Sequence, residues 1–421
     1  MPENLSPIPP CNLEGEVRLP VVAQIQVTRN CNLACAYCFQ EHSGGIIGLS
    51  TVETILPRLI AHNLTVDPLN KVMQIYWHGG EPLLASSDFF RAILRLESQY
   101  PEVTFDNRIQ TNGTLMNDEL ARLLVEHQFQ VGFSLDGPKE IHDRYRRSPG
   151  CRAGSFDATL RGIEHYRRHA MVERVAVIAV VTRAGIGRAA DLFKFFKELK
   201  AEVQLDIYDV RWLDLSLGAR EVSGLSDLAP RPEEVGGFLI ELFDLWFWDQ
   251  DRQVDFNELR QEVKMVLQPE INRGDPFHKK RCDFRRLIFA PNGKVFSCDQ
   301  WVNDEQTALG DIHHDSLATI LTNKAVLWEK IRQRIRQSGE HMACGSCEWG
   351  RQCGGGCFTC LKYNAMLLRA RAEGLPDNRW ADAVLPPAWD EVRGETYYCE
   401  GLRAFRNYLR EVVRQELAHA G

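Results

Sequence analysis

The chain has 421 residues, enough for two or three domains or for one large barrel with an attached module. Its formal net charge of -7 and its isoelectric point near 6.0 argue against a nucleic-acid partner. No apolar run reaches the length of a membrane span, and no signal peptide is recognisable. These features predict a cytoplasmic protein without a membrane partner.

The first half of the chain alternates apolar, β-branched runs with amphipathic stretches. Six strands that alternate with helices predict an α/β fold with a parallel sheet, as an open sheet or a partial barrel. Active sites in such folds gather at the carboxyl ends of the strands. The predicted strands are Val22–Thr28, Val72–Trp77, Thr104–Thr111, Gln130–Leu135, Val175–Thr182 and Val203–Val210, and the predicted helices are Val52–His62, Asp88–Gln99, Asn117–His127, Phe156–Arg168 and Arg188–Leu199.

Composition and spacing divide the chain into four parts. Residues 1–20 are rich in proline and form an irregular leader, and residues 21–232 contain the predicted strands, with a loop from Ser216 to Pro232 at their end. Residues 233–281 are predicted to form a helical connector. Residues 282–421 form a module in which cysteine spacing replaces periodicity as the main signal.

The 13 cysteines are the main chemical signal, because cytoplasmic thiols stay reduced and seldom form disulfide frameworks. Cys31, Cys35 and Cys38 follow the first predicted strand with the spacing CxxxCxxC. Three such thiolates can bind three irons of a cubane cluster, which leaves the fourth iron open to a small molecule. A structural zinc site needs a fourth ligand, and three free buried cysteines are the remaining alternative. Cys11 and Cys151 have no motif around them and are expected to be ordinary cysteines.

The cysteine motif, with the aromatic Tyr37 inside it, resembles the signature of the radical S-adenosylmethionine (SAM) superfamily. Three further segments match in order at the ends of predicted strands: Gly79-Gly80-Glu81-Pro82, Gln110-Thr111-Asn112-Gly113 and Ser134-Leu135-Asp136. The resemblance implies that Glu81 and the neighbouring backbone hold the methionine amino group and that Ser134 contacts the carboxylate. The residues that it implies for cofactor binding are Tyr37, Gly79, Gly80, Glu81, Asn112 and Ser134.

This resemblance implies a partial (β/α)6 barrel that binds SAM and a catalytic [4Fe-4S] cluster. A reduced low-potential cluster donates one electron to the sulfonium, and cleavage gives methionine and a 5′-deoxyadenosyl radical. The radical removes hydrogen from an unactivated C–H bond. A flavodoxin or ferredoxin is the expected electron donor.

The C-terminal cysteines form a long ordered series: Cys282, Cys298, the block Cys344, Cys347, Cys353, Cys357 and Cys360, and Cys399 near the end. This series resembles the SPASM domain, which holds one or two auxiliary [4Fe-4S] clusters. Zinc ribbons also use paired CxxC units, but they do not explain the long ordered series found here. The fourth cysteine of one cluster, expected soon after Cys282, is absent; Cys360 could replace it, or one iron is open to substrate. The implied ligands are Cys344, Cys347, Cys353 and Cys399 for one cluster, and Cys282, Cys298 and Cys357 for the other.

Asp299 directly follows Cys298. In the maturases that oxidise a sulfatase cysteine or serine, an Asp at this place is proposed as the general base, because a carboxylate can accept a proton from an oxidised product radical. The alternative is a loop Asp that caps a turn.

SPASM enzymes mostly modify peptides or proteins, and two reactions compete as predictions. The first is maturation of a ribosomally made peptide by crosslinking or oxidation, in which a separate leader-binding partner protein, or the surfaces of the barrel and the module, would recognise the leader. His78 before the GGEP motif resembles the cyclophane-forming maturases. The second is anaerobic sulfatase maturation, which makes formylglycine from Cys or Ser; Asp299 and the segment around Cys399 favour it. A small-molecule dehydrogenase and a non-catalytic iron–sulfur scaffold also remain open.

Overall fold

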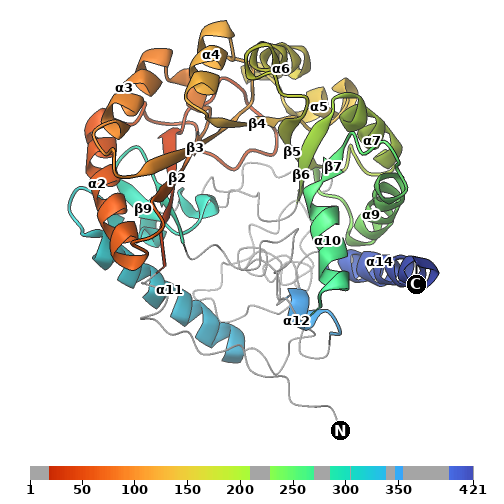
Figure 1. Ribbon diagram of the computed structural model, residues 1–421. Helices are drawn as coiled ribbons and strands as arrows, with labels where there is room; N and C mark the ends of the chain where they lie inside the picture. Colours follow the sequence, from red (N-terminus) through yellow and green to blue (C-terminus); the bar gives the residue numbers. More distant parts are fainter. Residues whose placement is uncertain are drawn as a thin grey trace.

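The computed structural model describes residues 19–208, 228–269, 285–303, 305–337, 347–353 and 398–420. These residues form one ten-stranded sheet in the order β10-β9-β8-β1-β2-β3-β4-β5-β6-β7. Its central six strands are parallel and follow chain order, and Figure 1 shows them as an arc with helices on the convex side. The six strands are β1 (Val22–Thr28), β2 (Val72–Gly79), β3 (Thr104–Thr111), β4 (Gln130–Ser134), β5 (Val175–Val181) and β6 (Ala201–Ile207).

All six predicted strands are confirmed. Their ends differ from the prediction by at most three residues, and the predicted end of the sixth, Val210, lies outside the described residues. The five predicted helices are confirmed as well. One short helix of the barrel, α5 (Lys139–Tyr145), was not predicted. Two arginines, Arg146 and Arg147, directly follow it. The five predicted helices are α2 (Leu49–Val66), α3 (Ser87–Glu97), α4 (Asp118–Glu126), α6 (Phe156–Ala170) and α7 (Ala189–Glu198).

Strand alternation separates two chemically different faces of the sheet. Odd-numbered residues such as Ile25, Ile75 and Trp77 are fully buried in the main apolar core, which also includes helix residues such as Leu56. Even-numbered residues point to the opposite, concave face and are mostly polar, as the row of Gln24, Tyr76, Arg108 and Gln130 shows. The fold therefore presents a polar inner face at which several strands end together.

The cysteine-rich module extends the barrel sheet directly. Strand β8 (Arg286–Phe289) pairs in parallel with β1, and β9 (Lys294–Phe296) and β10 (Gly310–Asp311) continue as antiparallel partners. Helix α11 (Leu317–Gln337) follows. This continuity was not predicted, and it brings the residues after β9 next to the end of β1.

The opposite edge of the sheet is closed by helices. The predicted helical connector is in fact two helices, α9 (Pro232–Phe247) and α10 (Asn257–Leu267), with the short strand β7 (Asp255–Phe256) between them. The C-terminal helix α14 (Cys399–Ala420) packs on α9.

Two contacts fix α14 in this position. A Cβ atom on Gly236 would lie 2.9 Å from the carbonyl oxygen of Gly401, so both helices need glycine there. Arg406 donates to the buried carboxylate of Glu262 on α10 at 2.6 Å. None of the described helices combines the length and the apolar composition that crossing a bilayer requires.

Candidate active site

The three N-terminal cysteines lie on the segment that follows β1, which we call the cysteine loop (residues 29–41). Cys31 and Cys35 are partly buried and Cys38 is exposed. The Cys31 Sγ atom accepts hydrogen bonds from the backbone N–H of Leu33 at 3.3 Å and from Asn112 Nδ2 at 3.7 Å. These two hydrogen bonds lower the pKa of the Cys31 thiol, in opposition to the larger effect of burial.

The paired glycines at the end of β2 let the cysteine loop approach closely. The N–H of Gly80 donates to Thr28 O at 2.7 Å, and the N–H of Glu81 donates to Asn30 O at 2.9 Å. A Cβ atom on Gly79 or Gly80 would overlap with these same carbonyl groups of the β1 end. Gly79 also has φ of 122°, in the region that disfavours other residues. The motif therefore has a structural role in addition to its predicted cofactor contact.

Glu81 is fully buried and fastens the end of β2 to the end of β3. Its carboxylate accepts from Thr111 Oγ1 at 2.7 Å, from the N–H of Asn112 at 2.7 Å and from the N–H of Leu83 at 2.9 Å. Burial raises the pKa of this carboxyl to about 7, against the opposing effect of these hydrogen bonds. Contact of Glu81 with the methionine amino group stays a prediction.

Asn112 and Ser134 lie at the ends of β3 and β4, at the same edge of the sheet. Besides Cys31, Asn112 Nδ2 donates to Asn32 Oδ1 at 2.9 Å, so Asn112 connects β3 to the cysteine loop. Ser134 Oγ accepts from Gln110 Nε2 at 2.9 Å. Both residues therefore lie where the resemblance implies a cofactor, and their cofactor contacts stay predictions.

A buried polar network behind the cysteine loop was not predicted from the sequence. The hydroxyl of Tyr37 donates to Asp136 Oδ2, and Arg146 Nε donates to the same oxygen at 2.9 Å. The Arg146 guanidinium also lies 5.3 Å from the centre of the Tyr37 ring. The backbone at the end of α5 and just after it accepts two bonds from the loop, from Ala34 N to Arg147 O at 2.7 Å and from Ala36 N to Tyr145 O at 2.9 Å. The loop is therefore fixed on both sides.

The environment of the thiols suits a positively charged partner. Burial raises the pKa of Cys31 to about 11 and that of Cys35 to about 12, although Arg146 opposes the second shift. A buried negative sulfur is costly without a counter-charge, which iron provides. No three His, Cys, Asp or Glu side chains within the described ranges are arranged to hold a single metal ion. In a cubane each thiolate binds its own iron, so its ligands lie farther apart than those of one ion.

Four of the predicted auxiliary ligands are described: Cys298, Cys347, Cys353 and Cys399. All four are partly buried. Trp349, between Cys347 and Cys353, donates from Nε1 to Asn407 Oδ1 at 2.8 Å, which ties this segment to α14, the helix that Cys399 begins. Four further predicted ligands lie outside the described residues: Cys282, Cys344, Cys357 and Cys360.

Asp299 lies next to the end of β2. It opens the 3₁₀ turn η4 (Asp299–Trp301), and its carboxylate oxygen Oδ1 is 3.7 Å from the Sγ atom of Cys298. Burial lowers the pKa of His78, while the nearby Asp299 carboxylate acts in the opposite direction. Asn303, just after η4, donates to Phe39 O at 2.6 Å and accepts a bond from Arg29. The structure thus brings Asp299, His78 and the cysteine loop to one region.

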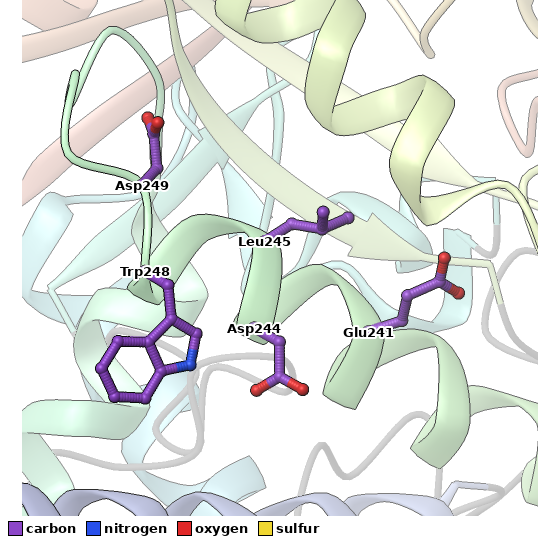
Figure 2. Close-up of a pocket in the computed structure, with 5 residues that line it drawn as sticks. All are labelled: Glu241, Asp244, Leu245, Trp248 and Asp249. Carbon is purple, nitrogen blue, oxygen red and sulfur yellow. The ribbon is translucent and has the colours of Figure 1, made fainter.

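Figure 2 shows a hollow elsewhere, on the outer side of the barrel beside α9. Two of the three acids that line it already have partners: Asp244 accepts from Tyr408 at 2.8 Å and Asp249 pairs with Lys197 at 2.6 Å. The described residues that line it include none of the predicted site, so the carboxyl edge of the inner face remains the candidate site.

Sequence comparisons identify the family. The Radical SAM superfamily model matches residues 25–194, and the SPASM iron–sulfur cluster-binding domain matches residues 281–353. A serine-type anaerobic sulfatase-maturating enzyme of Bacteroides thetaiotaomicron is 30% identical over 305 residues, which cover 69% of this chain and 72% of that protein. The chain belongs to the radical SAM superfamily.

Other relatives of this radical SAM protein agree with that assignment. A cysteine-type sulfatase-maturating enzyme of Clostridium perfringens is 27% identical over 78% of this chain and 86% of its own length. The solved structure "Native anSMEcpe with bound AdoMet and Cp18Cys peptide" superposes with a TM-score of 0.72 at 26% identity, covering 94% of this chain and 99% of that one. SuiB of Streptococcus suis bound to the precursor peptide SuiA gives 0.55 at 17% identity, covering 83% and 74%, and shares the fold.

The family assignment confirms the predicted cofactors. The protein is a radical SAM enzyme that uses SAM and a [4Fe-4S] cluster, and its SPASM domain binds auxiliary iron–sulfur clusters. The predicted α/β fold, with its partial barrel and SPASM domain, is confirmed as well.

Proposed function

We propose that this enzyme oxidises a cysteine or serine side chain of a sulfatase to formylglycine. The observation that carries the proposal is the position of Asp299, 3.7 Å from Cys298 Sγ on the segment that Asn303 ties to the cysteine loop through Phe39 O. Relatives that cover most of the chain are named anaerobic sulfatase-maturating enzymes, and the solved anSMEcpe structure holds AdoMet together with the Cp18Cys peptide. The relatives thus favour formylglycine formation, the reaction in which we assign Asp299 the role of general base.

The reaction removes two hydrogens from the substrate side chain, one as an atom and one as a proton, together with one electron. When bound, SAM and its cluster supply the radical that takes the Cβ hydrogen atom, and an auxiliary cluster supplies an acceptor for the electron. Asp299 takes the proton from the substrate sulfur or oxygen. Serine then gives the aldehyde directly, whereas cysteine gives a thioaldehyde that water converts to the aldehyde with release of hydrogen sulfide.

The remaining predicted residues would bind and orient. Cys31, Cys35 and Cys38 hold the catalytic cluster, and the Gly79–Gly80 backbone with Ser134 holds the methionine part of SAM. The network around Tyr37 keeps the cysteine loop in place and excludes water behind it, since Tyr37 is only 4% exposed. On the C-terminal side, Cys298 and the other described cysteines hold auxiliary clusters.

Peptide crosslinking is the second candidate, because two sequence features favour it. His78 stands where sulfatase maturases more often have Gln, and no cysteine follows Cys282 at the place where the maturases have one. Both reactions begin with removal of a side-chain hydrogen, so they differ in the fate of the oxidised side chain.

The test is product analysis with anaerobically reconstituted enzyme, dithionite, SAM and sulfatase-motif peptides that contain Cys or Ser at the target position. We expect 5′-deoxyadenosine and a peptide aldehyde that reacts with a hydrazide, with sulfur exchanged for oxygen in the cysteine peptide. A product that has lost two hydrogens but does not react with the hydrazide supports crosslinking instead. Absence of any modified peptide contradicts the proposal.

Asp299→Asn tests the proposed base. Loss of a general base costs about 10²- to 10⁴-fold in rate, so formylglycine falls by that factor while the iron content stays unchanged. Glu305→Gln is the matched control, because Glu305 is an exposed carboxylate of the same segment that pairs with Lys294. Equal product rates in Asp299→Asn and the wild type would remove Asp299 from the mechanism.

A further inference from the structure

Gln26 and His78 form an incomplete polar pair at the carboxyl edge of the inner face. They are register partners on the adjacent strands β1 and β2, so their side chains project from the same face about 5 Å apart. Gln26 is fully buried, yet neither its Nε2 nor its Oε1 atom has a hydrogen-bond partner among the described residues. The Nδ1 atom of His78 is buried and has no partner in the described ranges either.

Such an arrangement costs stability unless a ligand completes it. Leaving a buried polar group unsatisfied costs about 1–3 kcal/mol, and nearly all buried polar atoms in folded proteins have partners. Burial lowers the pKa of His78 and keeps the imidazole neutral, so one ring nitrogen donates and the other accepts. The pair therefore offers a side-chain amide donor, an amide acceptor and an imidazole nitrogen to one ligand.

These groups complement a peptide unit, which has one N–H donor and one C=O acceptor in a fixed plane. The primary amide of Gln26 can donate to the C=O and accept from the N–H of the same strand segment. An anion would find no charged donor in the pair. A purely apolar ligand would leave all three atoms unsatisfied.

The pair also lies where a substrate backbone would have to pass. Gln26 is two residues before the end of β1, which leads into the cysteine loop, and His78 directly precedes the glycines that contact this loop. Asp299 lies close enough to His78 for its carboxylate to oppose the lowering of the His78 pKa by burial. A peptide held by the pair would therefore place a neighbouring side chain near both the cluster loop and the proposed base.

We propose that Gln26 and His78 bind one backbone peptide unit of the substrate, adjacent to the residue that is oxidised. This inference rests on the proposed function and adds two positioning residues to it. Gln26 and His78 do no bond-making, and their effect is on peptide affinity.

The first test compares Gln26→Leu and His78→Phe with the wild type in binding the sulfatase-motif cysteine peptide, in binding SAM and in thermal stability. Gln26→Leu should weaken peptide binding about 10-fold, because two hydrogen bonds are lost, and His78→Phe should weaken it by a smaller factor, because one is lost. The SAM Kd of both variants should stay within about twofold of the wild type. The Tm of Gln26→Leu should be unchanged or higher, since an apolar side chain of similar size removes unsatisfied atoms. Gln74→Leu is the control: it lies on the same face of β2, but its amide already donates to Asp106 at 3.3 Å.

The second test replaces single amides of the peptide by esters, which removes one N–H donor at a time. One position next to the target cysteine should cost the wild type about fivefold in Kd and cost Gln26→Leu nothing. Equal ester effects in both proteins, or a weakened SAM Kd with an unchanged peptide Kd, would overturn the inference and leave the proposed function standing. A peptide that fails to bind the wild type removes the proposed function, and this inference with it.

Discussion

The inner face of the sheet has two levels that differ in how their polar groups are satisfied. At the lower level, away from the carboxyl edge, Asp106 accepts from Arg108 at 2.8 Å, from Gln74 at 3.3 Å and from Gln130 at 2.9 Å. Tyr76 lies between two guanidinium groups, with Arg108 at 5.3 Å and Arg286 at 4.9 Å from its ring centre. Side chains from four strands thus contact one another there, although the Nε atom of Arg286 has no hydrogen-bond partner among the described residues.

At the upper level the same two strands carry polar groups that the described part of the chain leaves without partners. Gln26 and His78 follow Gln24 and Tyr76 by two residues on the same face, yet each has buried atoms that bond to no described residue. Gln24 is intermediate, because its Oε1 accepts from Arg286 at 3.3 Å while its Nε2 has no partner within the same ranges. Our proposal that the upper level binds a ligand, whereas the lower level is structural, rests on this difference.

The largest effect is expected from a change in the cysteine loop, which follows the upper level of β1. Cys35→Ala removes a predicted ligand of the catalytic cluster, so 5′-deoxyadenosine formation should fall by more than about 100-fold and about four irons per chain should be lost. Iron analysis and nucleoside chromatography measure both. Cys151→Ala, at a cysteine outside every motif, should leave both values unchanged. Normal turnover by Cys35→Ala would show that the chemistry lies elsewhere.

A pH experiment sharpens the comparison by probing a satisfied network on the outer face, behind His78. Asn107 donates to both carboxylate oxygens of Glu97, at 3.0 and 2.9 Å, and accepts from Trp77 Nε1 at 2.8 Å. Burial nevertheless raises the pKa of Glu97 from 4.5 to about 7. The folded protein therefore binds more protons than the unfolded chain between these values, and stability falls as the pH rises through this window.

Glu97→Gln should remove this part of the pH dependence, which amounts to about 3 kcal/mol between about pH 4 and 8. Anaerobic denaturant titrations at several pH values measure it, with the exposed Glu119→Gln as control. Glu81, whose pKa burial also raises to about 7, keeps a similar slope in the variant. An undiminished slope in Glu97→Gln would mean that Glu97 is ionised in the folded protein at low pH.

The barrel strands could be predicted because their odd positions form an apolar series that the covering helices require. The extension of the sheet could not. Strand β8 is four residues long and pairs with β1, from which it is separated by more than about 250 residues, so no local pattern records the pairing. Strand β7 has two residues and was absorbed into a predicted helical connector for the same reason.

The candidate site divides along the same line. Cysteine spacing and the GGEP motif are local, and they identified the loop and its partner. The bonds of Tyr37 and Arg146 to Asp136 join residues 99 and 10 positions apart, and only the folded chain brings them together. The unsatisfied amide of Gln26 also could not be predicted from the sequence. It depends on the absence of a hydrogen-bond partner on every described element that surrounds it in the fold.

The smallest effect on activity, and the sharpest contrast with Gln26, is expected from a substitution at the lower level of the inner face. Asp106→Ala leaves Arg108, Gln74 and Gln130 without their shared acceptor. This should cost about 1–2 kcal/mol of stability, because Arg108 and Gln74 are half-buried, whereas Gln130 is exposed and adds little. Formation of 5′-deoxyadenosine and peptide affinity should stay within about twofold of the wild type.

Gln26→Leu should do the reverse, keeping stability and losing affinity. Replacing a satisfied acceptor destabilises the folded state, because its hydrogen bonds are lost. Replacing an unsatisfied amide removes a buried polar group whose desolvation only a bound ligand would have offset. Denaturant titration and peptide binding on the two variants side by side decide the matter. If Asp106→Ala lost peptide affinity and kept its stability, the lower level would be part of the peptide-binding site, and the distinction between the two levels of the inner face would be wrong.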